Sequence, residues 1–419
     1  MNQRILILTA GSQGDVQPYV ALGVGLTQAG FDVTLATDAS FSDLVNRHGL
    51  PFAPLRAPFA QLAQTEAGKA ALSGKKSVQL RQIMPMLRQM MDDAWAVAHA
   101  LQPGAVIYHP KVLAGYHIAE KLAVPGFLAM ALPGYSPTEA FFNPMLGGGD
   151  RGPWLNRLSY SLFFKLALLP YRGLINRWRS EALALPPVQS EFVLRGQPIS
   201  KLYGYSPQVV PIPQDWDSSS VVTGYWFLDG AANWQPPADL VAFLAQGSPP
   251  VYLGFGSMVS QDAERLTRLT LDALQQAGQR AILATGWGGL SSFSGEGPEN
   301  VYVLKAAPHD WLFPHCVAVV HHGGAGTTGA GLRAGKPTLI CPFIGDQPFW
   351  GQRVFELGVG PRPIPHRQLT SDSLAQALRT LVADSGMQQR AANLGASLRD
   401  EQGVACAVEV LRQRWLEEI

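Results

Sequence analysis

One arrangement occurs twice in this chain and limits the folds that it can adopt. Residues 5–10 form an uninterrupted apolar run, which is typical of a strand buried on both faces of a sheet. A turn at 11–14 follows, and residues 15–29 have the pattern of a helix, with Pro18 in its first turn. A second apolar run at 31–37 completes a βαβ unit.

The same order of elements returns between residues 251 and 285. A strand is predicted at 251–255, a helix at 261–277 and another strand at 280–285. The Gly-Ser pair at 11–12 recurs at 256–257, and Leu-Ala-Thr at 35–37 recurs at 283–285. The sequence therefore predicts an α/β fold of two doubly wound, Rossmann-like domains in series.

The length and the charge distribution agree with two domains. The chain has 419 residues, which suggests two or three domains. We expect one domain at 1–223, a second at 224–403, and a final helix at 404–419 that packs back on the first. Residues 1–223 carry 18 basic and 14 acidic side chains, whereas 224–419 carry 14 and 17. A phosphate site in the second domain would therefore use backbone N–H groups and helix ends.

The composition excludes several classes of protein. The formal net charge of +1 argues against a nucleic-acid binder. The three cysteines form no CxxC pair, which argues against a zinc ribbon or a disulfide scaffold. No targeting or membrane-spanning segment is recognisable, so we expect a cytoplasmic protein.

The most specific motif is HHGGAGTT at 321–328, which follows a predicted strand at 317–320. Gly326, Thr327 and a second threonine can begin a helix, and a glycine-rich helix start exposes N–H groups that bind anions. His322 would add a polar donor at its mouth. The alternative is a tight strand-to-helix turn that needs glycine and has two incidental histidines.

A second motif, GDQPFW, occupies 345–350 after the next predicted strand. A carboxylate and an amide at the carboxyl end of a strand suit sugar hydroxyls, because the carboxylate accepts and the amide both donates and accepts. The alternative is that Asp346 only caps the following helix.

These motifs resemble a known family. APHDWLFP at 307–314, HHGGAGTT and GDQPFW together resemble the donor signature of the family 1 nucleotide-sugar glycosyltransferases. GSQGDVQP at 11–18 resembles its sterol 3β-glucosyltransferases and bacterial glycopeptide, macrolide and lipid transferases, and TGYWFLD at 223–229 and INRWR at 175–179 are most similar to the sterol enzymes. The resemblance implies the GT-B fold, inversion at the anomeric carbon, and no essential metal or cofactor.

The resemblance also implies roles for individual residues. His322 and the N–H groups around Gly324, Gly326 and Thr327 would hold the donor diphosphate. The remaining residues expected on the donor side are Gly11, Ser12, Ser257, Ala307 at the base, His309 at the ribose, and Asp346 and Gln347 at the hexose. Ala306 and Ala330 replace the tryptophan and glutamate of the plant pattern. UDP rather than dTDP is thus an expectation from the sterol resemblance.

Asp15 is the candidate catalytic base, because it follows the first strand and would face the cleft. The GxxG turn before it lacks the third glycine of a dinucleotide site, and its carboxylate would repel a pyrophosphate. The alternative is a first-turn acid that stabilises its own helix dipole.

Two segments suggest a lipophilic, sterol-like acceptor. A helix predicted at 77–101, broken at Pro85, holds four of the nine methionines, and Met84 and Met90 are acceptor candidates unless they are simply core residues. Residues 151–179 contain six basic side chains, no acidic one, and many apolar residues. This segment either rests on an anionic membrane or lines the pocket, where Phe163 and Phe164 would join His109.

Several functions remain open from the sequence. The first is hexose transfer from UDP-glucose to a sterol or similar alcohol. The second is transfer of a dTDP- or UDP-linked sugar to a macrolide, glycopeptide or hydroxy-fatty acid. A dinucleotide oxidoreductase and a non-catalytic nucleotide-sugar binder are the alternatives from other classes.

Overall fold

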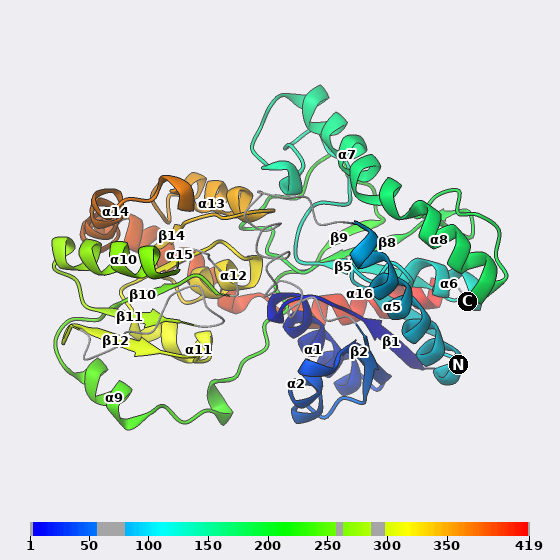
Figure 1. Cartoon of the computed structure of the whole chain (residues 1–419), viewed down its shortest axis with the longest axis horizontal. Helices are drawn as coiled ribbons and strands as arrows, with labels where there is room; N and C mark the ends of the chain where they lie inside the picture. Colours follow the sequence, from blue (N-terminus) through cyan, green and yellow to red (C-terminus); the bar gives the residue numbers. More distant parts are fainter. Residues whose placement is uncertain (1–2, 57–79, 257–262, 286–297, 418–419) are drawn as a thin grey trace.

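Each of the two predicted βαβ units belongs to its own parallel sheet, and the two sheets form separate lobes (Figure 1). The computed structural model describes residues 3–56, 80–256, 263–285 and 298–417. The first lobe is coloured blue to green in Figure 1, and the second is coloured green to orange.

The sheet of the first lobe has the strand order β3-β2-β1-β4-β5-β8-β9, and all its pairs are parallel. Its strands are β1 (Arg4–Leu8), β2 (Asp32–Asp38), β3 (Phe52–Leu55), β4 (Ala105–Tyr108), β5 (Gly126–Met130), β8 (Ser200–Tyr203) and β9 (Ser220–Val222). Strands β1, β4 and β5 are almost wholly buried, as expected where helices cover both faces of a parallel sheet. A short antiparallel pair, β6 (Val193–Leu194) and β7 (Gln197–Pro198), lies outside this sheet.

The sheet of the second lobe has the order β12-β11-β10-β13-β14 and is also parallel. Its strands are β10 (Val251–Gly254), β11 (Ala281–Ala284), β12 (Val301–Leu304), β13 (Ala318–His321) and β14 (Thr338–Ile340). The two sheets thus repeat one topology. In each, the first strand of the βαβ unit (β1 or β10) lies inside the sheet, the next two strands lie on one side of it, and the later strands lie on the other side.

Helices cover the sheets. The first lobe has α1 (Gln13–Gln28), α2 (Ser42–Arg47), α5 (Leu80–Leu101), α6 (Gly115–Leu122), α7 (Pro153–Leu168) and α8 (Arg172–Trp178). The second has α9 (Ala238–Ala245), α10 (Ala263–Ala277), α11 (His309–Leu312), α12 (Ala325–Arg333), α13 (Gln347–Glu356), α14 (Ser371–Ala383) and α15 (Ser385–Asp400), and α16 (Gly403–Glu417) ends the described chain. No helix in these described segments is both long and apolar enough to span a bilayer.

Each sheet contains one point where the direction of strand addition reverses. This point lies between β1 and β4 in the first lobe, and between β10 and β13 in the second. Neighbouring connections leave toward opposite faces at such a point, and the carboxyl ends of the two strands there are where ligands bind in open α/β sheets. The predicted site residues Asp15 and His109 follow β1 and β4, and His322 follows β13.

The chain crosses between the lobes at two glycines that touch each other. A side chain at Gly224, whose φ is +95°, would lie 3.1 Å from the Cα of Gly403, and one at Gly403 would overlap the carbonyl oxygen of Tyr225. After this crossing α16 packs on α1, and its Trp415 stacks on Phe31, in the turn after α1, with ring centroids 5.4 Å apart. Figure 1 shows α16, in red, running from the second lobe across the middle of the first.

The predicted elements and the observed ones agree within a few residues, with one clear exception. The break expected at Pro85 was wrong, because α5 continues through this residue as a single helix. Pro85 is exposed, so the prolyl ring and the missing hydrogen bond face solvent rather than the core. The expected residues 77–79 at the start of this helix lie outside the described residues.

The contact between the two glycines predicts the effect of a single methyl group. Gly403→Ala should lower the free energy of unfolding by about 1 to 3 kcal/mol, because the added carbon overlaps backbone that cannot move independently. Urea unfolding followed by circular dichroism measures this change. Gly173→Ala is the matched control, since Gly173 lies in α8 with no atom within 4 Å of the added carbon. Equal stability of the two variants would contradict the tight crossing.

Candidate active site

The turn between β1 and α1 holds the Asp15 carboxylate at the first reversal point. The backbone N–H and the hydroxyl of Ser12 both donate to Asp15 Oδ2, at 2.7 and 2.9 Å. Gly11 has a φ of +137°, and a side chain there would overlap this carboxylate. Asp15 therefore also stabilises its own helix, as the alternative interpretation predicted, because its Oδ2 atom caps the start of α1.

The loop after β4 brings two further groups to Asp15. Lys111 Nζ donates to Asp15 Oδ2 at 2.7 Å, and His109 Nε2 lies 3.5 Å from Asp15 Oδ1. The backbone N–H of Lys111 donates to His109 Nδ1 at 3.0 Å, so the neutral ring carries its proton on Nε2. The Oδ2 atom therefore has three donors, whereas Oδ1 faces one distant N–H and is the oxygen left for a further proton donor.

These contacts fix the charges of the cluster. Burial would raise the pKa of Asp15, but the Lys111 ammonium, His109 and the hydrogen bonds outweigh it and lower the pKa to about 2. Burial lowers the pKa of His109 to about 4, against the opposing effect of Asp15. At neutral pH the cluster thus contains a carboxylate, an ammonium and a neutral imidazole.

The second reversal point holds His322 above two glycines. A side chain at Gly256, after β10, would lie 2.8 Å from His322 Cε1, and one at Gly324 would lie 2.7 Å from His322 Nε2. The turn between β13 and α12 also needs Gly323, whose φ is +96° and whose N–H donates to His321 Nδ1 at 3.0 Å. The glycines of the motif therefore make room for an imidazole as well as for the turn.

The amino end of α12 faces the same space. Its N-cap residue is Gly324, which has no side chain to bond the first N–H groups of the helix. Gly326 is exposed, and no atom lies within 4 Å of the position of a side chain there. A helix start of this kind can bind an anion through the N–H groups around Gly326 and Thr327 and the helix dipole, and diphosphate binding here stays a prediction.

Burial keeps two histidines of this lobe, His322 and His309, uncharged at neutral pH. Burial, with a smaller effect of His309, lowers the pKa of His322 to about 4, and burial likewise lowers that of His309 to about 4. His322 Nδ1 is buried without a hydrogen-bond partner among the described residues. A diphosphate bound here would meet N–H donors and a helix end rather than cations, in agreement with the charge distribution of the sequence.

The loop after β14 carries Asp346 and Gln347. Asp346 does not cap α13 through its side chain, and its Oδ2 atom instead accepts from Trp350 Nε1 at 2.8 Å. Gln347 is buried, and its Oε1 atom accepts from the N–H groups of Phe343 and Ile344 at 2.7 and 3.1 Å. Burial and the negative charge of Asp15 raise the pKa of Asp346, so the two lobes bring these carboxyl groups within electrostatic reach.

Two of the remaining donor-side residues follow the carboxyl end of β12, and the third is not among the described residues. Ala307 is half-buried just before α11, and His309 begins this helix with its ring stacked on Phe313, 4.3 Å between centroids. Ser257 lies outside the described residues.

The acceptor candidates divide into two groups. Phe163 and Phe164 of α7 lie near Tyr135, with ring centroids 5.9 and 5.5 Å away, and Phe164 also meets Phe192 at 4.7 Å. Met84 is half-buried in α5, whereas Met90 has no exposed surface and packs in the core of the first lobe. The core-packing alternative therefore applies to Met90, which can affect an acceptor only through its neighbours.

The sequence interpretation missed three residues that the fold brings to these clusters. Lys111 lies two positions after His109, and a basic residue in the loop after a buried strand was a usable signal. Tyr135 follows β5 by five residues, and strand order places this loop beside the site. Phe192 had no local signal, because it comes close to Phe164 only through tertiary packing.

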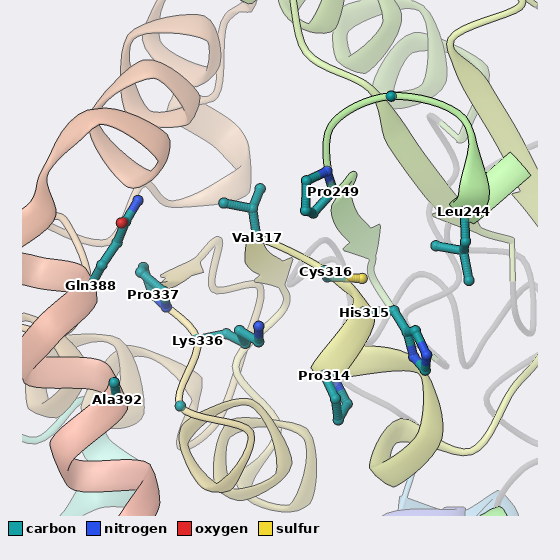
Figure 2. A pocket seen from close by; sticks show the side chains of 12 residues that line it. Leu244, Pro249, Pro314, His315, Cys316, Val317, Lys336, Pro337, Gln388 and Ala392 are labelled. Atoms are coloured by element: carbon teal, nitrogen blue, oxygen red, sulfur yellow. The ribbon is translucent and has the colours of Figure 1, made fainter.

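A separate cavity of about 540 Å³ lies at the opposite end of the second sheet (Figure 2). Pro249, Val317 and Pro337 precede β10, β13 and β14, so this cavity is at the amino ends of the strands. Figure 2 shows Lys336 and Cys316 among its lining side chains. Within the described ranges, no three His, Cys, Asp or Glu side chains are grouped as metal ligands would be.

Two sequence-family models match this chain. The glycosyltransferase family 28 N-terminal domain matches residues 5–140, and the erythromycin biosynthesis protein CIII-like C-terminal domain matches residues 268–412. The two matches fall in the two lobes and include the Asp15 turn and the His322 loop, respectively.

Curated relatives match nearly the whole chain. The sterol 3-beta-glucosyltransferase UGT80B1 of Arabidopsis thaliana is 38% identical over 427 residues, covering 99% of this chain and 69% of the relative. UGT80A2 of the same plant is 39% identical, covering 97% and 64%. The sterol 3-beta-glucosyltransferase of Aspergillus clavatus is 39% identical, covering 97% and 29%. The chain thus spans about two thirds of the plant proteins and less than one third of the fungal one.

Solved structures share the architecture. The glycotransferase of kitacinnamycin has a TM-score of 0.75 at 20% identity, covering 98% of this chain and 99% of its own. Glycosyltransferase VinC, solved in complex with dTDP, has a TM-score of 0.70 at 20% identity, covering 98% of both chains. These similarities confirm the predicted GT-B fold.

The open space at Gly326 predicts how a carboxylate there would act. Gly326→Glu should fold normally but weaken UDP binding at least about tenfold, because a negative charge would face the diphosphate at the helix start. Isothermal titration calorimetry with UDP measures the affinity. Gly326→Ala is the control and should bind UDP with nearly unchanged affinity. Unchanged binding by Gly326→Glu would argue against this end of α12 as the diphosphate site.

Proposed function

This chain belongs to the glycosyltransferase family of the sterol 3β-glucosyltransferases, and on that premise we propose that it moves a hexose from a nucleoside diphosphate sugar to a hydroxyl of a lipophilic alcohol. UDP-glucose is the proposed donor and a sterol-like molecule the proposed acceptor, because the relatives named above are sterol 3-beta-glucosyltransferases.

The proposal rests on two groups of residues with complementary chemistry, one at each reversal point of strand order. At the first point, the Asp15 carboxylate keeps its Oδ1 oxygen free of strong donors. At the second point, no side chain caps the N–H groups at the start of α12. Transfer of a glycosyl group needs a proton acceptor beside the attacking hydroxyl and donors beside the leaving diphosphate. Each group of residues supplies one of these needs.

In the proposed reaction, the acceptor oxygen attacks the anomeric carbon while its proton passes to Asp15 Oδ1. A new bond forms between this oxygen and the anomeric carbon, and the bond from that carbon to the diphosphate oxygen breaks. The leaving diphosphate takes the electron pair, and the N–H groups of α12 and His322 stabilise its charge. Attack from the side opposite the leaving group inverts the configuration.

Asp15 is a weak base, and its surroundings explain how it would still act. The Lys111 and His109 contacts keep it ionised and oriented at every physiological pH. The proton should therefore move late, once the acceptor oxygen has become acidic through bond formation. Alignment across the cleft and stabilisation of the diphosphate supply the rest of the rate acceleration.

Asp346 is proposed to accept hydrogen bonds from the hexose hydroxyls. Its carboxyl group lies on the second lobe, is influenced by the charge of Asp15, and keeps one oxygen that does not bond Trp350. Gln347 supports this role by holding the 343–344 backbone through its side-chain oxygen. No metal ion is required in this scheme, so a chelator should leave turnover unchanged.

A donor-by-acceptor matrix tests the proposed function. UDP-glucose, UDP-galactose and dTDP-glucose are each combined with a sterol, a macrolide and a hydroxy-fatty acid, and products are identified by mass spectrometry. We expect the highest turnover with UDP-glucose and the sterol. Asp15→Asn should lower that turnover by about 10²- to 10⁴-fold while UDP affinity stays nearly constant.

Other results would change the conclusion. Product with dTDP-glucose and the macrolide alone would favour the second function left open by the sequence. Absence of product with every pair, despite UDP binding, would favour a non-catalytic binder. Wild-type turnover in Asp15→Asn would remove Asp15 from the role of base.

Lys111 should control the pH dependence of the reaction. In Lys111→Met the ammonium that lowers the pKa of Asp15 is lost, while the burial that raises it remains. The pKa of Asp15 therefore rises, the carboxylate is protonated at a higher pH, and the acidic limb of the kcat/KM profile should move up by about 1 to 3 pH units.

Lys121→Met is the control for this shift, because Lys121 is exposed on α6. Its acidic limb should match that of the unmodified protein. An unshifted limb in Lys111→Met, with only a lower affinity for UDP, would instead make Lys111 a donor ligand.

A further inference from the structure

Helix α7 directs a row of large apolar side chains into solvent. Trp154, Leu158, Leu162 and Leu166 are spaced four residues apart, and their exposed fractions are 73%, 46%, 48% and 61%. Residues with this spacing share one face of a helix. Leu169, in the turn after α7, continues the row and is 66% exposed. A face of this kind normally packs inside a protein.

The opposite face of α7 is polar where it meets its own lobe. Asn156 is fully buried, and its Nδ2 atom donates to the carbonyl of Glu139 and to Asp150 Oδ1, both at 2.8 Å. Ser159 is buried too, and its hydroxyl accepts from the N–H of Asn143 at 2.8 Å. The helix is therefore anchored by hydrogen bonds and aromatic rings, and turns its leucines away from the core.

Basic side chains surround the apolar row. Residues 151–179 contain six basic and no acidic side chains. Arg151 precedes the row, Lys165 lies next to Leu166 near its end, and Arg172 follows it, and all three are exposed. Arg157 is also exposed and lies 3.6 Å from Asp215, whereas Arg179 is buried and paired with Glu120. The surface thus combines an apolar centre with a mainly positive border.

We propose that the outer face of α7, defined by Trp154, Leu158, Leu162, Leu166 and Leu169, docks on an anionic lipid bilayer. The helix would lie in the plane of the membrane, with the leucines among the acyl chains and the basic side chains near the lipid phosphates. Trp154 suits the interface between head groups and acyl chains. Figure 1 shows α7 at the outer edge of the first lobe, where a flat surface can approach it.

Charge favours a membrane over a second copy of the chain. Two copies joined through this face would bring Arg151, Lys165 and Arg172 of each close to those of the other, and like charges in an interface oppose association. An anionic membrane neutralises the same side chains. The proposal does not rest on the transferase activity, although a membrane would be a source of a lipophilic acceptor.

Flotation of the full chain with vesicles tests this surface. Phosphatidylcholine vesicles are compared with vesicles of phosphatidylcholine and phosphatidylglycerol in equal amounts. We expect binding to the mixed vesicles that weakens as salt is added. Leu162→Gln/Leu166→Gln should lower the partition coefficient by about tenfold or more, since two leucine side chains no longer enter the bilayer. Lys165→Gln/Arg172→Gln should weaken binding about tenfold on mixed vesicles and leave neutral vesicles unaffected.

Val241→Gln is the matched control, because Val241 on α9 is 46% exposed, as Leu158 is. This variant should bind vesicles as the unmodified chain does, and circular dichroism should show all variants folded. Absence of vesicle binding by the unmodified chain, or an equal loss in Val241→Gln, would overturn the proposal. A dimer that Leu162→Gln/Leu166→Gln converts to monomer, without vesicle binding, would show a second copy to be the occupant.

Turnover on a detergent-dispersed acceptor separates this inference from the proposed function. Leu162→Gln/Leu166→Gln should keep that turnover, because both leucine side chains lie in solvent rather than against the aromatic rings near Tyr135. Vesicle binding without any product would contradict the transferase and leave the membrane surface intact, and product without vesicle binding would do the reverse.

Discussion

The reversal of strand order is the constraint on which the rest of this structure depends. A parallel sheet that grows in both directions from a central strand must send neighbouring connections to opposite faces, and this opens a crevice at the carboxyl ends of two strands. The chain does this twice, at β1/β4 and at β10/β13. Asp15 and His109 lie at the first of these reversal points, and His322 lies at the second.

Side-chain contacts between the lobes hold the two reversal points near each other. Phe349 of α13 packs against Phe141 of the first lobe, with centroids 5.7 Å apart, and Arg353 donates to the carbonyl of Val209 at 2.9 and 3.0 Å. The glycine crossing and α16 tie the lobes again from the other side. The electrostatic effect of Asp15 on Asp346 is a consequence of this arrangement.

Local sequence patterns were sufficient for the elements and for the glycine-rich turn. Buried strands, Gly-Ser turns and the HHGGAGTT motif each depend on near neighbours, so the repeated βαβ order and the fold class could be predicted. The contact of Phe164 with Phe192 joins residues 28 positions apart, and no local pattern encodes it. The place of Lys111 after a buried strand can be seen in the sequence, but its hydrogen bond to Asp15, 96 positions away, depends on the strand order. The uninterrupted helix at Pro85 also depended on which side of α5 faces solvent.

The basic segment at 151–179 shows a different limit of sequence interpretation. Its composition fits membrane contact and pocket lining equally well, and in the structure α7 has one aromatic face near Tyr135 and one leucine face in solvent. The orientation of a helix against its lobe decides which residues are available, and here the buried Asn156 and Ser159 set that orientation. A helix with apolar residues on most of its surface does not reveal this from its sequence.

A crystal structure of Asp15→Asn with UDP-glucose tests whether the two reversal points form one site. We expect the diphosphate within hydrogen-bond distance of the Gly326 and Thr327 N–H groups and of His322, with the anomeric carbon toward residue 15. A nucleotide bound instead in the cavity beside Lys336, at the amino ends of the strands, would contradict this expectation.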